Sequence, residues 1–219
     1  KQKVIEGAKQ VIENLERERR YFGHSLKKLD NIEIINIGSL CKLMTGGTPS
    51  TSKKEYYENG EIKWLVSGDI HKGEIFDCDG RISKLGVENS NAKLLPKNSV
   101  LIALNGQGKT RGTVALLRTE ASCNQSIVAM LPIDSSVITS EYLYFILKSK
   151  YREIRNITGE NQRSGLSMPI IRGIKIPVPN LDVQDKLVSE MESQDKIIES
   201  NKKLIEIMEK KIQEVLEAI

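Results

Sequence analysis

The stretch SVLIALNGQGKTRGTVALL, residues 99–117, places Gly108-Lys109-Thr110 shortly after an apolar run. A strand that leads into a glycine-rich loop ending in Gly-Lys-Thr is the start of a phosphate-binding loop, whose chemistry is nucleotide hydrolysis. That motif also requires a glycine five positions before Gly108 and a helix that begins at Lys109. Ala103 stands in the glycine position, and the β-branched residues after the loop favour a strand. We therefore interpret the stretch as strand, loop and strand, with nucleotide hydrolysis as the disfavoured alternative.

The loop itself offers amide, cationic and hydroxyl side chains. These groups are the ones that proteins use on the edges of bases and on phosphates. They are Asn105, Gln107, Lys109, Thr110 and Arg111. The sequence therefore predicts an anion-facing loop that approaches the phosphates of a nucleic acid, not those of a nucleotide.

Other sets of catalytic residues do not emerge from the sequence. His24 and His71 have neither a neighbouring nucleophile nor the spacing of metal ligands. Cys41, Cys78 and Cys123 have no Cys-x-x-Cys spacing, so we expect buried thiols, a reducing cytoplasm, and no metal or cofactor in this chain. No apolar run approaches the ~18 residues that a membrane span needs, and the start is not a signal peptide, so no membrane is expected.

The charge is distributed unevenly along the chain, whose formal net charge is +4. Residues 1–30 carry +3, residues 31–180 carry +5 and residues 181–219 carry −4. Within the middle, residues 148–175 hold seven Lys or Arg against two Glu. The basic middle of the chain indicates that it binds a polyanion, and the acidic end indicates a different partner for that segment. A solvated surface explains the charge distribution equally well.

Segment 181–219 has the clearest pattern, because its apolar positions alternate between spacings of four and three, as in a coiled-coil seam. Gln194 and Asn201 are polar seam residues, which commonly fix register or the choice of partner. Prolines before the segment stop the helix from extending backwards, and Asp182 is the expected cap. The seam consists of Leu187, Met191, Gln194, Ile198, Asn201, Ile205, Met208, Ile212, Val215 and Ile219.

A similar seam predicts a helix over most of residues 3–29, although Arg19 interrupts it. The two terminal helices could pair with each other or with the same helices of a second chain.

The middle of the chain alternates short apolar runs with turn signals, which is typical of strand-rich α+β structure. One amphipathic helix is expected over 140–155, capped by Thr139 or Ser140. The expected strands are 34–37, 62–66, 100–104, 113–117, 127–131 and 174–178.

Six stretches of the chain, in order, resemble segments of the specificity subunits of type I restriction–modification enzymes. They cover a spacer helix, the opening of a target-recognition domain, its later strands and helix, and the closing segment that leads into a long helix. The stretches are KQKVIEGAKQVIEN (1–14), GGTPSTSKKEYYENGEIKWLVSGDI (46–70), NAKLLPKNSVLIA (91–103), NQSIVAMLP (124–132), SEYLYFILKS (140–149) and SGLSMPIIRGIKIPVPNLDVQDKLV (164–188).

The resemblance implies a non-catalytic reader of double-stranded DNA, directed to a bipartite target. It implies a spacer helix at 1–30, a recognition domain at 31–180 and a coiled-coil helix at 181–219. It also implies partners: methyltransferase subunits that hold S-adenosylmethionine, and a restriction subunit. The chain departs from the family in having one recognition domain, so it is either a fragment or a half-subunit that forms a homodimer through its terminal helices. A purely structural coiled-coil protein is the remaining alternative.

The resemblance and the side-chain chemistry together give the expected DNA contacts. Trp64 is expected in the core, not as a stacking platform. Lys148, Lys150, Arg152 and Arg155 are expected to be phosphate contacts or a solvated helix face. Besides the loop residues 105–111, the expected contacts are Thr48, Ser50, Lys53, Lys54, Ser67, Asp69, Gln162, Arg163 and Ser164.

Overall fold

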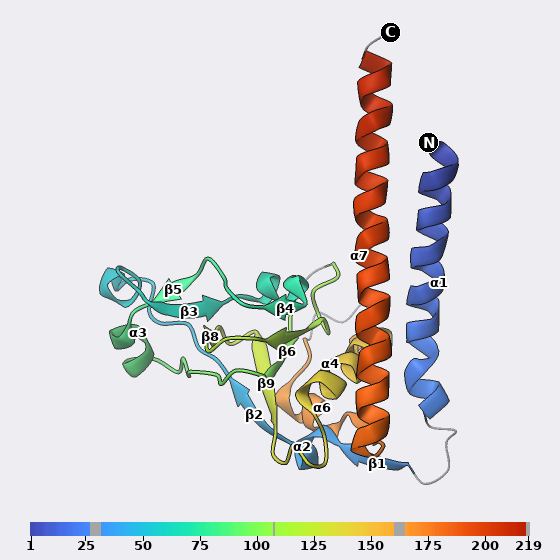
Figure 1. Cartoon of the computed structure of the whole chain (residues 1–219). Helices are drawn as coiled ribbons and strands as arrows, with labels where there is room; N and C mark the ends of the chain where they lie inside the picture. Colours follow the sequence, from blue (N-terminus) through green and yellow to red (C-terminus); the bar gives the residue numbers. More distant parts are fainter. Residues whose placement is uncertain (27–31, 107, 160–164, 218–219) are drawn as a thin grey trace.

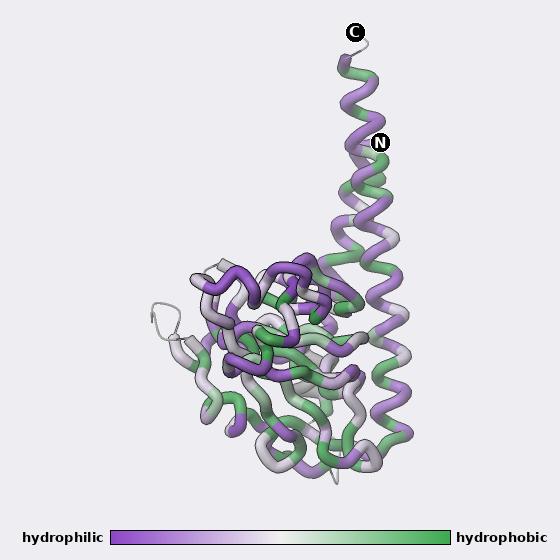
Figure 2. Tube along the Cα trace, turned by 90° about the vertical axis from the view of Figure 1, so that its left-hand side faces the viewer, coloured by the Kyte–Doolittle hydropathy of each residue, from purple (hydrophilic) through white to green (hydrophobic). Residues whose placement is uncertain are grey.

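The computed structural model describes residues 1–26, 32–106, 108–159 and 165–217. An α+β domain lies beside one end of two long helices, α1 (Gln2–Leu26) and α7 (Leu181–Glu217), which we call the helix pair (Figure 1). The C-terminal end of α1 and the N-terminal end of α7 are the ends next to the domain. The helix pair runs on well past the domain, so that the hydropathy-coloured trace shows one compact body and one projecting rod (Figure 2). None of the described helices is both long and apolar enough to cross a bilayer.

The two helices of the pair are antiparallel. The Lys1 Nζ donates to the Lys211 carbonyl at 3.2 Å, whereas near the domain Arg19 Nη1 lies 2.5 Å from Asp195 Oδ1. At 1.5 Å per residue, the 37 residues of α7 span about 55 Å. The predicted terminal helices are therefore confirmed, and within this chain they pair with each other.

The predicted seam of α7 faces α1 along most of its length. Met191, Gln194 and Ile198 are buried; Met191 belongs to the hydrophobic cluster of the domain, and Gln194 bonds to Arg19 of α1. Half-buried positions continue the seam, and Val215 is 49% exposed because it lies past the end of α1. The half-buried seam residues are Leu187, Asn201, Ile205, Met208 and Ile212.

The first turn of α7 is fixed to the domain. Asn180 Oδ1 accepts from the Val183 amide at 3.0 Å, so Asn180 is the cap and the expected cap, Asp182, lies inside the first turn. Gln184 is fully buried: its Oε1 accepts from the Thr139 amide, and its Nε2 donates to the carbonyls of Val137 and Pro179 at 2.8 and 2.9 Å. A buried amide satisfied on three sides joins the helix to the domain tightly.

Three sheets make up the domain, with strand orders β2-β9-β6-β7-β4, β5-β3-β8 and β1-β10. All six predicted strands are confirmed. They are β1 (Glu33–Asn36), β3 (Ile62–Leu65), β6 (Val100–Ala103), β7 (Val114–Leu117), β9 (Ile127–Pro132) and β10 (Lys175–Val178). The strands that the sequence did not indicate are β2 (Cys41–Thr45), β4 (Glu74–Ile75), β5 (Arg81–Ile82) and β8 (Ser122–Cys123).

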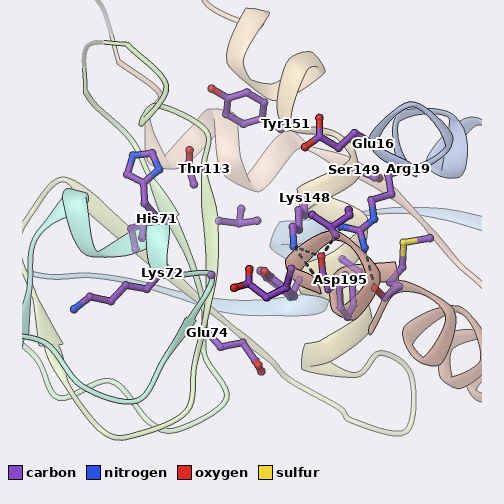
Figure 3. Close-up of a pocket in the computed structure, with 18 of the residues that line it drawn as sticks. Glu16, Arg19, His71, Lys72, Glu74, Thr113, Lys148, Ser149, Tyr151 and Asp195 are labelled. Atoms are coloured by element: carbon purple, nitrogen blue, oxygen red, sulfur yellow. Dashed lines mark hydrogen bonds and ion pairs between the residues drawn. The ribbon is translucent and has the colours of Figure 1, made fainter. Parts of the chain in front are cut away.

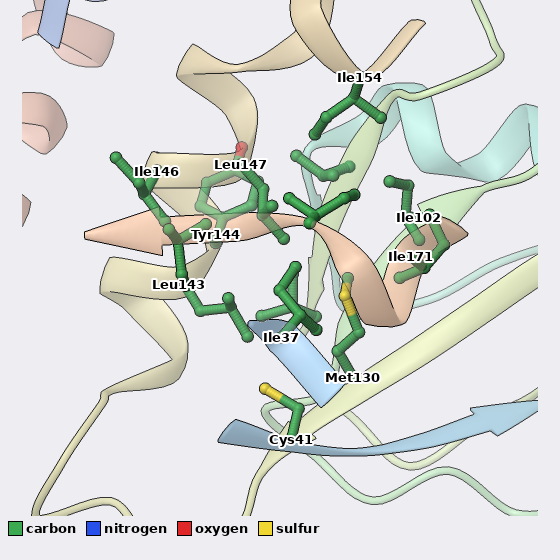
Figure 4. Packing of buried hydrophobic residues seen from close by; sticks show 14 of the residues in the cluster. Ile37, Cys41, Ile102, Met130, Leu143, Tyr144, Ile146, Leu147, Ile154 and Ile171 are labelled. Atoms are coloured by element: carbon green, nitrogen blue, oxygen red, sulfur yellow. The ribbon is translucent and has the colours of Figure 1, made fainter. Parts of the chain in front are cut away.

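The five-stranded sheet is buried on both faces, since successive side chains of a strand point to opposite sides. On β6, Val100 and Ile102 join one hydrophobic cluster, whereas Leu101 and Ala103 join another. The first cluster packs against the domain's helices (Figure 4). This double burial explains why these strands read as continuous apolar runs.

Short helices complete the domain. The expected helix 140–155 is divided at Lys150 into α4 (Ser140–Ser149) and α5 (Tyr151–Asn156), and the Thr139 hydroxyl caps α4 by accepting from the Tyr142 amide at 3.2 Å. The Lys150 side chain is buried and pairs with Glu153 at the break. The remaining helices are α2 (Ile37–Leu40), η1 (Lys54–Tyr56), η2 (Ser67–Lys72), α3 (Lys84–Glu88) and α6 (Met168–Gly173).

Candidate nucleic-acid interface

The segment between β6 and β7 is a strand, loop and strand, as the sequence predicts. The two strands pair antiparallel, with Ile102 opposite Val114, and the described residues 108–117 form a turn and a strand where a phosphate-binding loop would start a helix. Gly108 and Gly112 have φ of +68° and +82°, a left-handed conformation that glycine adopts without strain. The geometry of a nucleotide phosphate cradle is therefore not present in these residues.

Contacts from two other elements hold this loop in place. The Tyr151 hydroxyl of α5 donates to the Lys109 carbonyl at 2.8 Å, which leaves the Lys109 side chain exposed. On the opposite side, His71 Nε2 of η2 lies 3.0 Å from Thr110 Oγ1. Asn105, also exposed, lies next to Gly165. The loop, η2 and α5 thus form one surface, which we call the loop face.

Arg111 occupies a different place from the one expected. Its side chain is only 7% exposed, and Nη2 donates to the Gly159 carbonyl at 3.2 Å. Its own carbonyl accepts from Arg155 Nη1 at 3.2 Å. Arg111 and Arg155 therefore anchor the loop face from within, and the Arg111 side chain is covered, not projecting. The reason is that the loop folds back on α5, so the residue at its base is covered.

The η2 residues also differ from a simple exposed turn. Asp69 Oδ2 accepts from the Val66 amide at 3.0 Å, and its Oδ1 lies 2.9 Å from Lys72 Nζ. Hydrogen bonding to Asp69 raises the pKa of Lys72, which therefore stays cationic. Asp69 is thus occupied in shaping η2, whereas Ser67 is half-buried beside it.

Segment 46–54 contacts the turn before β9, where the Ser126 carbonyl accepts from the amide of Leu104, just before the loop. The Gly47 amide donates to the Cys123 carbonyl at 2.9 Å, and a Cβ on Gly46 would come within 1.8 Å of that oxygen, so this approach requires glycine. Thr48 Oγ1 then donates to Gln125 Oε1 at 2.5 Å, and both side chains lie at the surface. Gln125 was not among the predicted contacts.

Other predicted contacts lie apart from the loop face or cannot be placed. Ser50 bonds to Ser52, and Lys53 stacks over the Tyr56 ring at 5.2 Å, in the neighbourhood of η1 with Lys54. Among the described residues, no hydrogen bond joins these three to the loop face. Trp64 is half-buried and donates to the Gly47 carbonyl at 3.0 Å, consistent with a packing role. The predicted contacts Gln107, Gln162, Arg163 and Ser164 lie outside the described residues.

A cleft of about 1130 Å³ separates the loop face from the helix pair, and we call it the helix–domain cleft. His71, Lys72 and Thr113 line one side, and residues of α1 and α7 line the other (Figure 3). At its base Asp195 accepts from Arg19 of α1 at 2.5 Å and from Lys148 of α4 at 3.1 Å. This three-helix charge cluster fixes the helix pair against the domain and uses the Lys148 charge internally.

The described residues offer few reactive groups. The three cysteines are buried and free, as expected, and burial raises the pKa of Cys41 and Cys123 to about 12. Neutral thiols at physiological pH are poor nucleophiles. Among the described residues, no group of three His, Cys, Asp or Glu side chains is placed to hold a metal ion.

Comparison with known proteins points to one family. Residues 30–210 match the family model described as "Type I restriction modification DNA specificity domain". The chain is 28% identical over 176 residues to the type I restriction enzyme EcoR124I/EcoR124II specificity subunit of Escherichia coli, covering 79% of this chain and 43% of that protein. It is also 28% identical over 183 residues to the MjaIX specificity subunit of Methanocaldococcus jannaschii, covering 81% and 41%. The chain thus spans less than half the length of these two relatives.

Two solved structures share the fold. The S subunit of a type I restriction–modification system from M. genitalium matches with a TM-score of 0.63 and 18% identity, over 98% of this chain and 56% of that one. A chain from a study of complex assembly and conformational transition of the type I R-M system matches with a TM-score of 0.70 and 14% identity, over 98% and 53%. The α+β domain with long flanking helices is therefore an arrangement that those proteins also adopt.

Proposed function

Since this chain belongs to the type I restriction modification DNA specificity domain family, we propose that it recognises a DNA sequence and catalyses no step itself. The observation that carries the proposal is the loop face, where η2, the 105–113 loop and α5 meet through the Thr110 and Lys109 contacts. Such a surface offers amides, hydroxyls and cations on a rigid support, which is what readout of a duplex requires.

The side chains of this surface, together with Gln125 in the turn beside it, divide between two tasks. Lys109 and Arg152 are exposed cations suited to phosphates, which position the protein without reading sequence. Asn105 and Gln125 are exposed amides, and a side-chain amide can bind adenine through two hydrogen bonds in the major groove. Thr48, hydrogen-bonded to Gln125, orients that amide.

The partners in the proposal follow from the names of the relatives, which are specificity subunits of type I restriction enzymes. The chain would direct methyltransferase subunits, which carry S-adenosylmethionine, and a restriction subunit to DNA in the cytoplasm. The helix pair, which projects from the domain, is the natural surface for these proteins (Figure 1).

A bipartite target needs a second recognition domain, and a second copy of this chain would provide one. Several apolar residues of the helix pair remain exposed although α1 and α7 already cover each other. A homodimer through the terminal helices would bury them, as expected for a coiled-coil surface. These residues are Val4, Val11, Ile197, Ile207, Val215 and Leu216.

The proposal is tested by co-expressing the chain with a type I methyltransferase subunit and mapping methylated adenines on the DNA of the host. The expected result is co-purification together with methylation at one recurrent sequence. Methylation without sequence preference, or no association with DNA in any assembly, would contradict it. Turnover of ATP or GTP by the isolated chain would favour the nucleotide-hydrolysis alternative instead.

A further inference from the structure

Four cations that line the helix–domain cleft have no ion-pair partner among the described residues. Lys109 and Arg152 belong to the domain, whereas Lys196 and Lys202 belong to α7 on the opposite wall. All four side chains are exposed. The cleft therefore has unpaired positive charge on both of its walls.

The acidic residues of the cleft do not offset this charge. Glu74 is paired with Arg118 at 2.7 Å, and Asp195 is paired with both Arg19 and Lys148. Glu199 lies 3.9 Å from Lys203, so these two charges compensate each other. Glu16 is left as the single lining carboxylate without an ion-pair partner in the described part of the chain. The surplus of free charge in the cleft is positive.

We propose that the helix–domain cleft binds the phosphate backbone of DNA, with Lys196 and Lys202 of α7 supplying one wall and Lys109 and Arg152 the other. The inference rests on the proposed function and extends it to the helix pair. Residues 181–219 carry a net charge of −4, so α7 is acidic as a whole. The proposal nevertheless places two of its lysines in the DNA interface.

Two features favour an extended polyanion over a small anion as the occupant. The cations are exposed and stand on separate walls, whereas a site for one small anion needs donors that converge on a point. The cleft is also continuous with the loop face, because His71, Lys109 and Tyr151 hold the loop and line the cleft at once. A DNA strand whose bases are read at the loop face therefore passes directly into the cleft.

The test compares two double variants that remove the same charge from the same helix. K196Q/K202Q removes the cleft lysines of α7, whereas K186Q/K210Q removes two exposed lysines that lie outside the cleft and have no ion-pair partner among the described residues. Binding of the full chain to two unrelated fluorescent duplexes is measured at several KCl concentrations. Thermal unfolding followed by circular dichroism establishes that each variant folds.

The expected result is a fall of about 1.8 in the slope of log Kobs against log salt for K196Q/K202Q, since each phosphate contact contributes about 0.9. The affinity for both duplexes falls by the same factor, because phosphate contacts do not read sequence. The K186Q/K210Q variant keeps the wild-type slope.

Equal slopes for the two double variants would overturn the inference while leaving the proposed function intact. Loss of methyltransferase binding by K196Q/K202Q with an unchanged DNA slope would also overturn it and assign the cleft to a protein partner. If the wild-type chain shows no salt-dependent binding to either duplex, the proposed function fails first.

Discussion

Arg19 of α1 donates from Nε to Gln194 Oε1 of α7 at 3.0 Å, so a polar residue that interrupts one terminal seam is the partner of a polar residue in the other. The same guanidinium donates to the Met191 carbonyl at 2.9 Å and to Asp195. Each residue weakens its own seam, and together they satisfy one another. Because the contact exists at one antiparallel alignment of the helices, it fixes their register.

Arg19→Met should lower the free energy of unfolding by about 1–3 kcal/mol, because Gln194 and the Met191 carbonyl lose a partner in a partly buried site. Urea titration measures the change. The matched control is Arg17→Met, which removes an exposed pair with Glu13 and should cost no more than about 0.5 kcal/mol. Equal effects of the two substitutions would show that Arg19 is an ordinary surface cation.

The free energy of unfolding should decrease in alkali, because burial in the folded chain disfavours the thiolate form of Cys41 and Cys123. Burial raises the pKa of Cys41 and Cys123 from 9.0 to about 12, so the unfolded chain loses these protons first. The stabilisation is complete below pH 9 and is lost as the pH rises from 9 towards 12. Between these pH values, each thiol lowers the free energy of unfolding by about 1.4 kcal/mol per pH unit.

Cys41→Ala/Cys123→Ala tests this slope by urea titration at a series of pH values. The double variant is less stable at neutral pH because of the cavities, but its stability should fall less steeply above pH 9 than that of the wild type. Cys78→Ala serves as the comparison for a less deeply buried thiol, whose pKa is also raised. Parallel curves for the wild type and the double variant would refute the prediction.

Gln125→Ala should relax the preference for one base pair without changing the salt dependence of DNA binding. Loss of a side-chain amide that contacts a base removes about 1–3 kcal/mol of discrimination, whereas phosphate contacts stay in place. Methylated-site mapping with the partner methyltransferase measures the preference. Gln213→Ala, far along α7, is the control and should leave the recognised sequence unchanged. An unchanged sequence for both variants would remove Gln125 from the readout.

The exposed apolar residues of the helix pair predict self-association. Val11→Ser/Ile197→Ser should shift the chain towards the monomer, because it removes apolar area from the surface that a second copy would cover. Light scattering at roughly tens of micromolar measures the state, a range suited to Kd values near 1 μM. A wild-type monomer at that concentration would contradict the proposed homodimer.

Each predicted strand stands out in the sequence as a short apolar run, and β6 and β7 are buried along their whole length. Residues 100–104, 114–117 and 127–131 are apolar without interruption because their sheet is covered on both faces. β2 escaped notice because Cys41–Thr45 mixes exposed and buried positions, and β4, β5 and β8 have two residues each. Such short strands exist because tertiary neighbours offer them a partner, and this information is not local.

The polar composition of the candidate site is evident in the sequence, but its geometry is not. Composition identified the 105–111 loop as polar and cationic, but it could not show that Arg111 turns inward to the Gly159 carbonyl. Gln125 lies just before the predicted strand 127–131, and only folding brings it to Thr48, 77 residues away. Likewise, the sequence does not distinguish Asp195 from the other acidic residues of its helix, whereas the structure places Arg19 and Lys148 beside it.

Gln184 and Asp195 clamp α7 to the domain at two points near one end, while the other end of the helix stands free. The helix pair can therefore rotate as a rigid arm about the point where it is attached to the domain. The part of α7 beyond Asp195 is about 33 Å long, so a rotation of one degree at the clamp moves its tip by about 0.6 Å. A partner protein bound at the tip, as proposed above, would therefore sense, and could impose, the angle at which the loop face meets a duplex.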